Sequence, residues 1–166
     1  MAKKAGDFAV AQIVPGDATE LLEQDHREVE SLFEQFEGLE DNSEKSKIAA
    51  RICLALTVHA QIEEELVYPA ARREIDKTDL VDEAEVEHAS AKQLIAEIGS
   101  MTPRDDLFDA KVKVLGEYVK HHVREEENEL FPKMREAGLD FYELGRKLAA
   151  RKTALLIQAK ESTGRR

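Results

Sequence analysis

The stretch HAQIEEELVYPAAR, residues 59–72, matches the stretch HVREEENELFPKMR, residues 122–135, when the proline of each is aligned. The alignment places His59 over His122 and Glu63 over Glu126. A histidine and a glutamate four residues apart lie on the same face of a helix. The chain therefore contains a repeated helical His-x-x-x-Glu unit.

The helical stretches that precede these two units also match each other. His26 and His88 occupy equivalent positions in them, and nearly the same number of residues separates each from the histidine of the following helix. Each half of the repeat thus supplies one histidine from a first helix and a His-x-x-x-Glu pair from a second. The pattern predicts two similar helical hairpins related by a pseudo-twofold axis.

Apolar residues recur at helical spacing in four long segments, and no segment alternates with the period of a strand. Breakers separate these segments: Gly38 with EDNSEKS, then DKTD, then Gly99 with Pro103, and Gly138. We therefore predict an all-α, up-down-up-down antiparallel four-helix bundle with an additional C-terminal helix. The predicted organisation is a flexible N-terminal arm over residues 1–18, a bundle over 19–138, and a C-terminal helix and tail over 139–166.

Charge and cysteine content narrow the classes of function. The formal net charge of -11 argues against binding of nucleic acid through a basic surface, although the last residues, 146–166, are locally basic. The single cysteine, Cys53, excludes an intramolecular disulfide and fits a reducing compartment. No stretch suits a signal peptide or a spanning helix. We expect a cytoplasmic monomer or homodimer with no membrane or nucleic-acid partner.

The repeat also distinguishes two adjacent histidines. His122 is the equivalent of His59, and its helix face carries mainly apolar residues with one acid: Leu115, Tyr118, Val119 and Glu126. The face of His121 is polar and carries Glu117, Glu125 and Asn128. We therefore expect His122 to point into the bundle and His121 to face solvent.

Buried carboxylates next to histidines indicate a cation site. A carboxylate in an apolar lane cannot remain charged without a partner, because removing it from water costs several kcal/mol. Two metal ions would compensate the predicted inward donors, which are His26, His59, Glu63, His88, His122 and Glu126. Mixed imidazole and carboxylate ligands suit iron or manganese. Six protein ligands for two metals require a bridging carboxylate and leave positions open for a small molecule.

The order His, His-x-x-x-Glu, His, His-x-x-x-Glu, with EEELVYP and EEENELFP after the paired histidines, resembles the bacterial hemerythrin-like (HHE cation-binding) domain over about residues 19–138. The resemblance implies a four-helix bundle with two iron ions that are oxo- or hydroxo-bridged, with manganese or zinc as substitutes. It assigns the same six residues as ligands, with Glu63 and Glu126 as bridges. It also implies dioxygen, peroxide or nitric oxide as the small ligand.

The sequence departs from the oxygen-carrying hemerythrins at two positions. Lys92 stands where those proteins have a further histidine, and the repeat favours Glu126 over Glu127 as the acid of the fourth helix. One metal therefore lacks its usual third imidazole. Tyr118 is our candidate to fill that position or to take part in catalysis, although a packing role is the commoner reading, and Glu30 is another candidate ligand.

Four functions are compatible with the sequence. The first is a non-heme di-iron protein that binds or senses dioxygen or a related small molecule. The second is peroxide decomposition, a catalase-like activity, at the same centre. The third is iron sensing or storage, in which metal occupancy controls folding. The fourth is a metal-free helical interaction module, which the symmetric placement of four histidines disfavours.

Overall fold

A computed structural model of the chain describes residues 16–164, so most of the arm predicted over residues 1–18 lies outside the described residues. The described residues form helices and connections, with no strand among them. In chain order the elements are α1 (Ala18–Glu37), α2 (Asn42–Ile62), η1 (Glu63–Val67), α3 (Tyr68–Glu74), α4 (Asp79–Gly99), α5 (Phe108–Glu125), η2 (Glu126–Leu130), α6 (Phe131–Glu136) and α7 (Phe141–Gly164).

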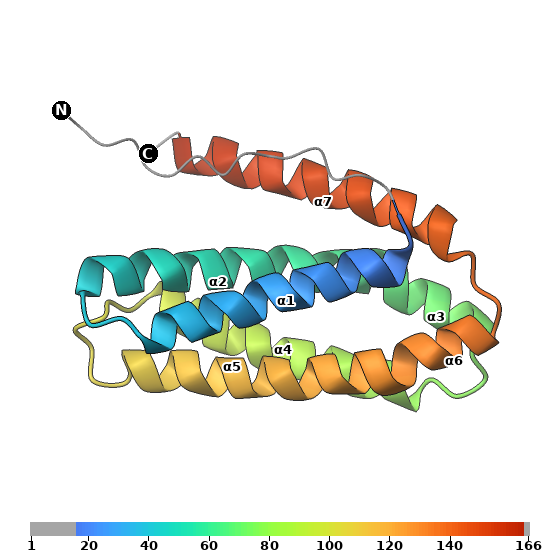
Figure 1. Cartoon of the computed structure of the whole chain (residues 1–166), viewed down its shortest axis with the longest axis horizontal. Coiled ribbons are helices and arrows are strands. Elements are labelled where there is room, and N and C mark those ends of the chain that lie inside the picture. The colour runs from blue at the N-terminus through green and yellow to red at the C-terminus, as the bar shows by residue number, and fades with distance from the viewer. Residues whose placement is uncertain (1–15, 165–166) are drawn as a thin grey trace.

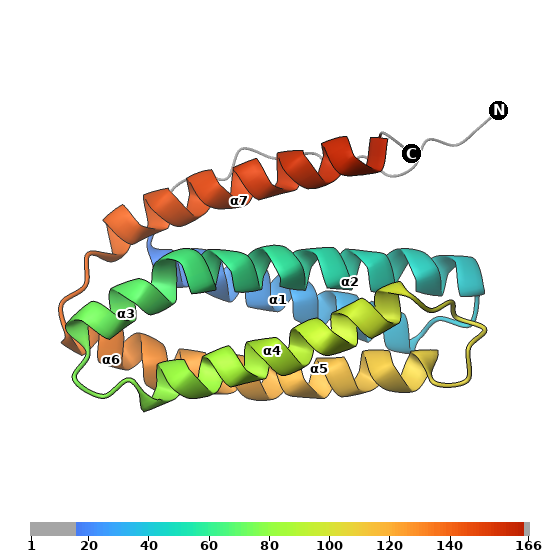
Figure 2. The ribbon, with the colours of Figure 1, turned by 180° about the vertical axis from the view of Figure 1, so that it is seen from behind.

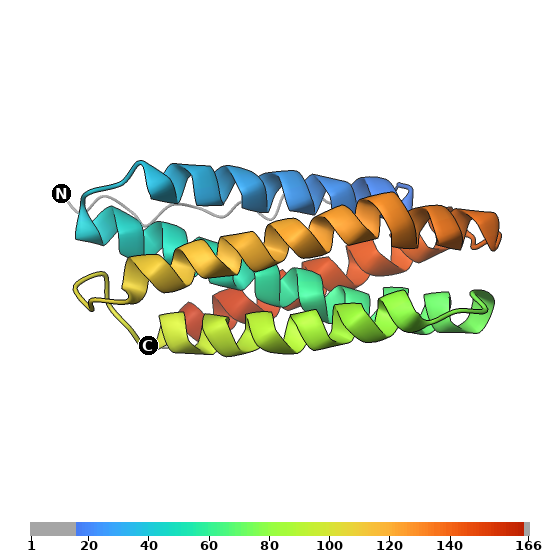
Figure 3. The ribbon, with the colours of Figure 1, turned by 90° about the horizontal axis from the view of Figure 1, so that it is seen from below.

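Two helical hairpins pack side by side into an up-down-up-down bundle (Figure 1). The first hairpin comprises α1 and α2 with α3, and the second comprises α4 and α5 with α6, as the reverse view shows (Figure 2). The helix α7 packs against α1 and α2, outside the four-helix arrangement (Figure 1), and in the view from below it lies behind the other helices (Figure 3). The predicted fold class, an all-α four-helix bundle with an additional C-terminal helix, is confirmed.

Aspartates begin three of the helices. The side chain of Asp17 accepts a hydrogen bond from the Thr19 backbone N–H at 2.8 Å, at the start of α1. Asp41 and Asp140 cap α2 and α7 in the same way, each at 2.9 Å. Such caps satisfy backbone donors that have no partner within the helix. The positions of these three aspartates therefore account for where α1, α2 and α7 begin.

The second and fourth long helices each contain one π-helical turn immediately before a proline. In η1 the Tyr68 N–H donates to the Glu63 carbonyl, and in η2 the Phe131 N–H donates to the Glu126 carbonyl. A proline inside an α-helix removes one hydrogen bond and clashes with the carbonyl four residues earlier. The wider π turn accommodates the proline. The helical path therefore continues past both prolines, and Glu63 and Glu126 are the first residues of the two π turns.

Apolar side chains form two clusters inside the molecule. The first cluster includes Leu22, Ile62, Val67, Leu130, Met134 and Leu148. The second cluster includes Val29, Leu32, Ile52, Val112 and Leu115. On α1, His26 lies between Leu22 of the first cluster and Val29 of the second. Buried polar residues therefore occupy a layer between two apolar clusters.

The helix α7 completes the first cluster. Its buried residues include Leu144, Leu148, Ala149 and Leu155. A Cβ on Gly145 would lie only 1.9 Å from the Gly16 carbonyl oxygen, so only glycine permits this close approach. None of the described helices is both long and apolar enough to span a membrane.

Candidate metal centre

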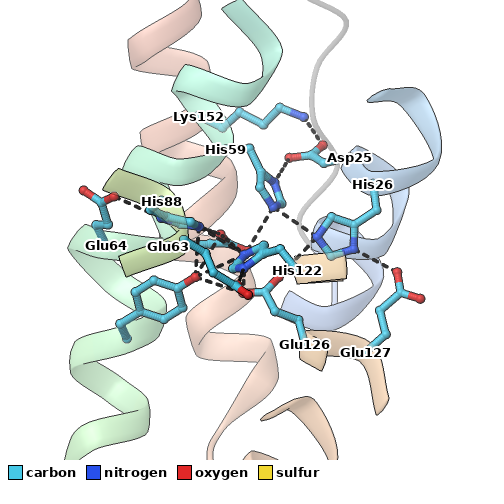
Figure 4. A network of polar contacts seen from close by, with 12 residues as sticks. Asp25, His26, His59, Glu63, Glu64, His88, His122, Glu126, Glu127 and Lys152 are labelled. Atoms are coloured by element: carbon cyan, nitrogen blue, oxygen red, sulfur yellow. Dashed lines mark hydrogen bonds and ion pairs between the residues drawn. The ribbon is translucent and has the colours of Figure 1, made fainter. Parts of the chain in front are cut away.

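The six predicted ligands meet in one buried layer of the bundle. The bundle helices α1, α2, α4 and α5 each supply one histidine. The two glutamates are the first residues of η1 and η2. All six side chains are buried, and Glu63 is 0% exposed. Figure 4 shows their side chains converging from different helices. The structure therefore brings together all six of the inward donors predicted from the sequence.

The histidines form two pairs. The Nε2 atoms of His26 and His59 lie 3.1 Å apart, and the Nε2 atoms of His88 and His122 are also 3.1 Å apart. Each pair contains one histidine from each helix of the same hairpin. The pseudo-twofold relation expected from the repeat is thus present in the positions of the imidazoles.

The two glutamates connect these pairs. Glu63 directs Oε1 toward His59 Nε2 at 2.9 Å and Oε2 toward His88 Nε2 at 3.2 Å. Glu126 directs Oε1 toward His122 Nε2 and Oε2 toward His26 Nε2, both at 3.3 Å. Each carboxylate therefore presents one oxygen to each histidine pair. This is the arrangement needed for a carboxylate that bridges two cations.

A carboxylate contacts the outer nitrogen of every histidine in the layer. The Nδ1···oxygen pairs are His26–Glu127 at 2.8 Å, His59–Asp25 at 3.2 Å, His88–Glu64 at 2.9 Å and His122–Glu87 at 2.6 Å. A carboxylate in this position fixes the tautomer of a metal-ligating histidine, because Nδ1 carries the proton and Nε2 presents its lone pair. All four lone pairs are then directed into the layer.

This donor set fits a pair of cations. When their Nε2 atoms carry no proton, two imidazoles 3.1 Å apart repel each other unless a metal ion lies between them. In that state His59 and His26 have no Nε2 proton to donate to the buried oxygens Glu63 Oε1 and Glu126 Oε2, and among the described residues these oxygens accept no other hydrogen bond. Buried polar atoms without partners are rare and costly. The lone pairs and the two oxygens therefore form a site that metal ions would complete.

Comparison with known proteins agrees with this geometry. The family model described as Hemerythrin HHE cation binding domain matches residues 17–134, which include all six inward donors. The chain belongs to the hemerythrin HHE cation-binding family. The resemblance inferred from the repeat is therefore confirmed, and the family and the buried donors together support metal binding in this layer.

Two known proteins are similar to this HHE domain. A protein of Nostoc sp. PCC 7120 named DNA nickase is 32% identical over 119 residues, which cover 70% of this chain and 33% of that protein. The chain thus spans about a third of the length of that curated relative. A crystal structure of an HHE cation-binding domain-containing protein of Mycobacterium kansasii shares the fold, with a TM-score of 0.77 at 22% identity, covering 88% of this chain and 91% of that one.

Charges within the HHE domain raise the pKa values of two buried histidines, His59 and His122. Burial alone lowers the pKa of His59, but the Glu63 carboxylate and the hydrogen bond to Asp25 outweigh burial and raise the pKa to about 10. Burial opposes the carboxylates at His122 as well, and Glu126 with Glu63 and Glu87 raises the pKa of His122 to about 12. In metal-free protein, protons on these imidazoles therefore compensate the buried carboxylates.

The HHE domain has one further polar residue at the centre that sequence reasoning missed. Tyr68 is 0% exposed, and its hydroxyl lies 3.0 Å from His88 Nε2 and 3.0 Å from Glu126 Oε1. Burial, followed by the charges of Glu63 and Glu126, raises the pKa of Tyr68 well above its usual value. Tyr68 therefore remains a neutral phenol that donates a hydrogen bond to the Glu126 carboxylate.

The two further candidates from the sequence, Tyr118 and Glu30, lie away from the layer. Tyr118 is 49% exposed. Glu30 pairs with Arg27 on the surface of α1. Lys92 pairs with the outer carboxylate Glu64. Among the described groups of His, Cys, Asp and Glu residues that could hold a metal ion, none includes Glu30.

The outer carboxylates follow the repeat, and this signal was available in the sequence. Glu64 and Glu127 each follow a bridging glutamate, and each contacts a histidine of the opposite hairpin. Asp25 and Glu87 each precede a histidine, and each contacts the second histidine of its own hairpin. The pairs of acids at equivalent repeat positions therefore carry equivalent contacts.

The adjacent histidines separate as the repeat predicts. His122 is 8% exposed and belongs to the layer. The side chain of His121 is 61% exposed and pairs with Glu125 at 3.2 Å and with Glu87 at 3.4 Å. His121 therefore lies outside the layer and contacts Glu87, the same carboxylate that contacts His122 Nδ1.

Proposed function

We propose that this HHE domain holds two iron ions in the central layer and binds or senses dioxygen or a related small molecule there. His26 and His59 would hold one ion, and His88 and His122 the other. Glu63 and Glu126 would bridge the two. An iron pair supplies electrons in ones and twos to small oxygen or nitrogen species, which include dioxygen, peroxide and nitric oxide. The chain's part is to orient the donors and to exclude water.

The observation that carries this proposal is the orientation of the two carboxylates. Glu63 and Glu126 each divide their two oxygens between the two histidine pairs. A site for one ion would not need this division. Imidazole with carboxylate is a donor set that suits iron and manganese, and bundle cores with glutamate and histidine on facing helices hold such pairs.

The number of protein donors supports small-molecule binding. The layer offers four imidazoles and two bridging carboxylates, whereas two ions of octahedral preference would accept more donors than these six supply. A small molecule would occupy the coordination positions that the protein leaves open. The two apolar clusters above and below the layer limit the access of water.

A spectroscopic experiment tests this function. The protein would be loaded with Fe(II) without oxygen, exposed to oxygen, and then returned to an oxygen-free atmosphere while its near-ultraviolet absorption is recorded. A change that appears with oxygen and reverses on its removal supports a binder or sensor. An iron-loaded protein whose spectrum does not respond to oxygen would contradict the proposal.

Peroxide decomposition is the second candidate, and Tyr68 favours it. A buried phenol that donates to Glu126 at 3.0 Å is placed to deliver or accept a proton at the centre. Decomposition converts two molecules of hydrogen peroxide into one of dioxygen and two of water, so proton movement must accompany electron transfer. Oxygen evolution from added peroxide by the iron-loaded protein, reduced in Tyr68→Phe and unchanged in Tyr118→Phe, would favour this activity over simple binding.

A further inference from the structure

We infer that the C-terminal helix α7 contributes to the metal centre, because Lys152 on α7 positions the proposed ligand His59. This inference rests on the proposed two-metal centre. It concerns a residue outside the span that the family model matches, residues 17–134. It therefore assigns a role to the helix whose function the sequence leaves open.

The inference begins with a three-residue chain of contacts. Lys152 Nζ donates to Asp25 Oδ1, and Asp25 Oδ2 contacts His59 Nδ1 at 3.2 Å. Figure 4 shows Lys152 and His59 each joined to the Asp25 carboxylate by a dashed line. One carboxylate therefore joins the ammonium group of α7 to the outer nitrogen of a metal ligand.

The other three outer carboxylates are held from within the bundle. Their partners in the described part of the chain are Arg27 on α1 for Glu127, Lys92 on α4 for Glu64, and His121 on α5 for Glu87. Asp25 alone among the four is paired with a residue of α7. The pseudo-twofold symmetry of the centre is therefore broken at His59.

Asp25 is also the most buried of the four. Its side chain is 9% exposed, compared with 24% for Glu127, 31% for Glu64 and 26% for Glu87. Water can replace a lost partner at the three more exposed carboxylates. At Asp25 it cannot do so easily, and an uncompensated buried charge is costly. The Asp25 contact to His59 thus depends on Lys152 more than its counterparts depend on their partners.

Other residues also anchor α7 to the bundle, so the helix should stay docked without Lys152. Arg151 makes two hydrogen bonds to Glu65 in η1, at 2.6 Å and 2.9 Å. Leu148 is 0% exposed in the first apolar cluster. Because these contacts anchor the same turn of α7, removal of the Lys152 charge should leave the helix in place and change only the outer contact of His59.

The expected consequence is selective loss of one metal. Outer partners of metal-ligating histidines fix ring orientation, and their loss typically weakens metal binding about 10–100-fold. Without Lys152, the ion held by His26 and His59 should bind that much more weakly. The ion held by His88 and His122 should keep its affinity, because its outer carboxylates keep their partners.

The test measures removal of Fe(II) from oxygen-free, iron-loaded full-length protein by a chromogenic chelator. Lys152→Met is compared with wild type and with three further variants. Lys152→Arg keeps the positive charge and should restore retention. Lys92→Met removes the counterpart at the more exposed Glu64, and Lys147→Met removes a lysine that pairs with Glu143 on α7 itself. The unfolding midpoint of each metal-free variant is recorded alongside.

The inference predicts that Lys152→Met releases one iron at about 10–100-fold lower chelator concentration than wild type, while the second iron, Lys152→Arg and Lys147→Met remain as wild type. Release of both irons as in wild type would overturn it. Equal weakening of both irons with a lower unfolding midpoint would also overturn it, because that result indicates only a structural role. A wild-type protein that binds no iron would instead overturn the proposed function itself.

Discussion

Tyr68 and Phe131 occupy equivalent positions in the two halves of the bundle, each at the end of the π turn that a bridging glutamate begins, but only Tyr68 brings a hydroxyl to the metal layer. Phe131 instead stacks parallel to His26, with ring centroids 6.3 Å apart and an interplanar angle of 1°. The surroundings of the two histidine pairs, which are the proposed metal positions, therefore differ in polarity. A small molecule would meet a hydrogen-bond donor beside His88 and a hydrocarbon face beside His26.

Substitution of Tyr68 by phenylalanine should destabilise the metal-free protein. The change removes a donor to the buried Glu126 carboxylate, and an unsatisfied buried acceptor typically costs about 1–3 kcal/mol. Tyr118→Phe is the matched control, because Tyr118 is half exposed, and its expected effect is within about 0.5 kcal/mol. Urea unfolding measures both. Equal losses in the two variants would show that the Tyr68 hydroxyl contributes nothing specific.

The stability of the metal-free protein should fall as the pH rises above neutrality. A histidine whose pKa is higher in the folded state contributes stability that is complete below its unfolded pKa, about 6.5, and is lost as the pH rises through its folded pKa. The folded values are about 10 for His59 and about 12 for His122. Each histidine should therefore remove up to about 1.4 kcal/mol per pH unit above pH 6.5.

Urea unfolding at pH 6.5, 8 and 9.5 checks this dependence. The lowered pKa of Glu63 affects stability only at acidic pH, so it does not offset the histidines in this range. Metal-loaded protein is the control, because bound metal requires neutral imidazoles and its affinity rises with pH. A metal-free stability that stays flat from pH 6.5 to 9.5 would rule out protonated histidines in the layer.

Gly145→Ala should weaken the docking of α7. The new Cβ would lie 1.9 Å from the Gly16 carbonyl, so the helix must shift, and overpacking of this kind typically costs about 1–3 kcal/mol. Gly99→Ala in α4 is the control, since nothing lies within 4 Å of a Cβ there. Thermal unfolding should show a loss for the first variant alone. A neutral Gly145→Ala would mean that α7 does not pack this closely.

Periodicity and the internal repeat were sufficient to predict the bundle and the six inward donors. Apolar residues at helical spacing fix which face of each helix is buried, and His59 with Glu63 lies on that face. The repeat then identifies the equivalent pair, His122 and Glu126, without any knowledge of the tertiary structure. These features depend on local geometry, which a helical pattern reports directly.

Tyr68 could not be found in the same way. In a regular α-helix a residue five positions after Glu63 lies about 140° round the axis, which would turn Tyr68 away from the layer. The π turn, with its hydrogen bond spanning five residues, brings Tyr68 back to the side of Glu63. Its repeat equivalent is Phe131, so the repeat gave no polar signal either.

Tyr118 illustrates the opposite error, in which a residue near the buried face is exposed. At about 100° per residue, Tyr118 lies about 40° to one side of His122, whereas Leu115 and Glu126 lie on the other side. Leu115 is 0% exposed and Glu126 is 2% exposed, so the buried face is centred away from Tyr118. Sharing a face with one ligand does not establish the direction of the core.

The histidine pair at residues 121 and 122 provides the most direct test of the central claim, because the two side chains are adjacent in sequence and only His122 enters the layer. The measurement is the iron content per chain of wild type, His121→Gln and His122→Gln after identical loading and desalting. The account predicts two irons in wild type and in His121→Gln, and a clear loss in His122→Gln. Equal iron contents in the two variants, or a wild type without iron, would contradict it.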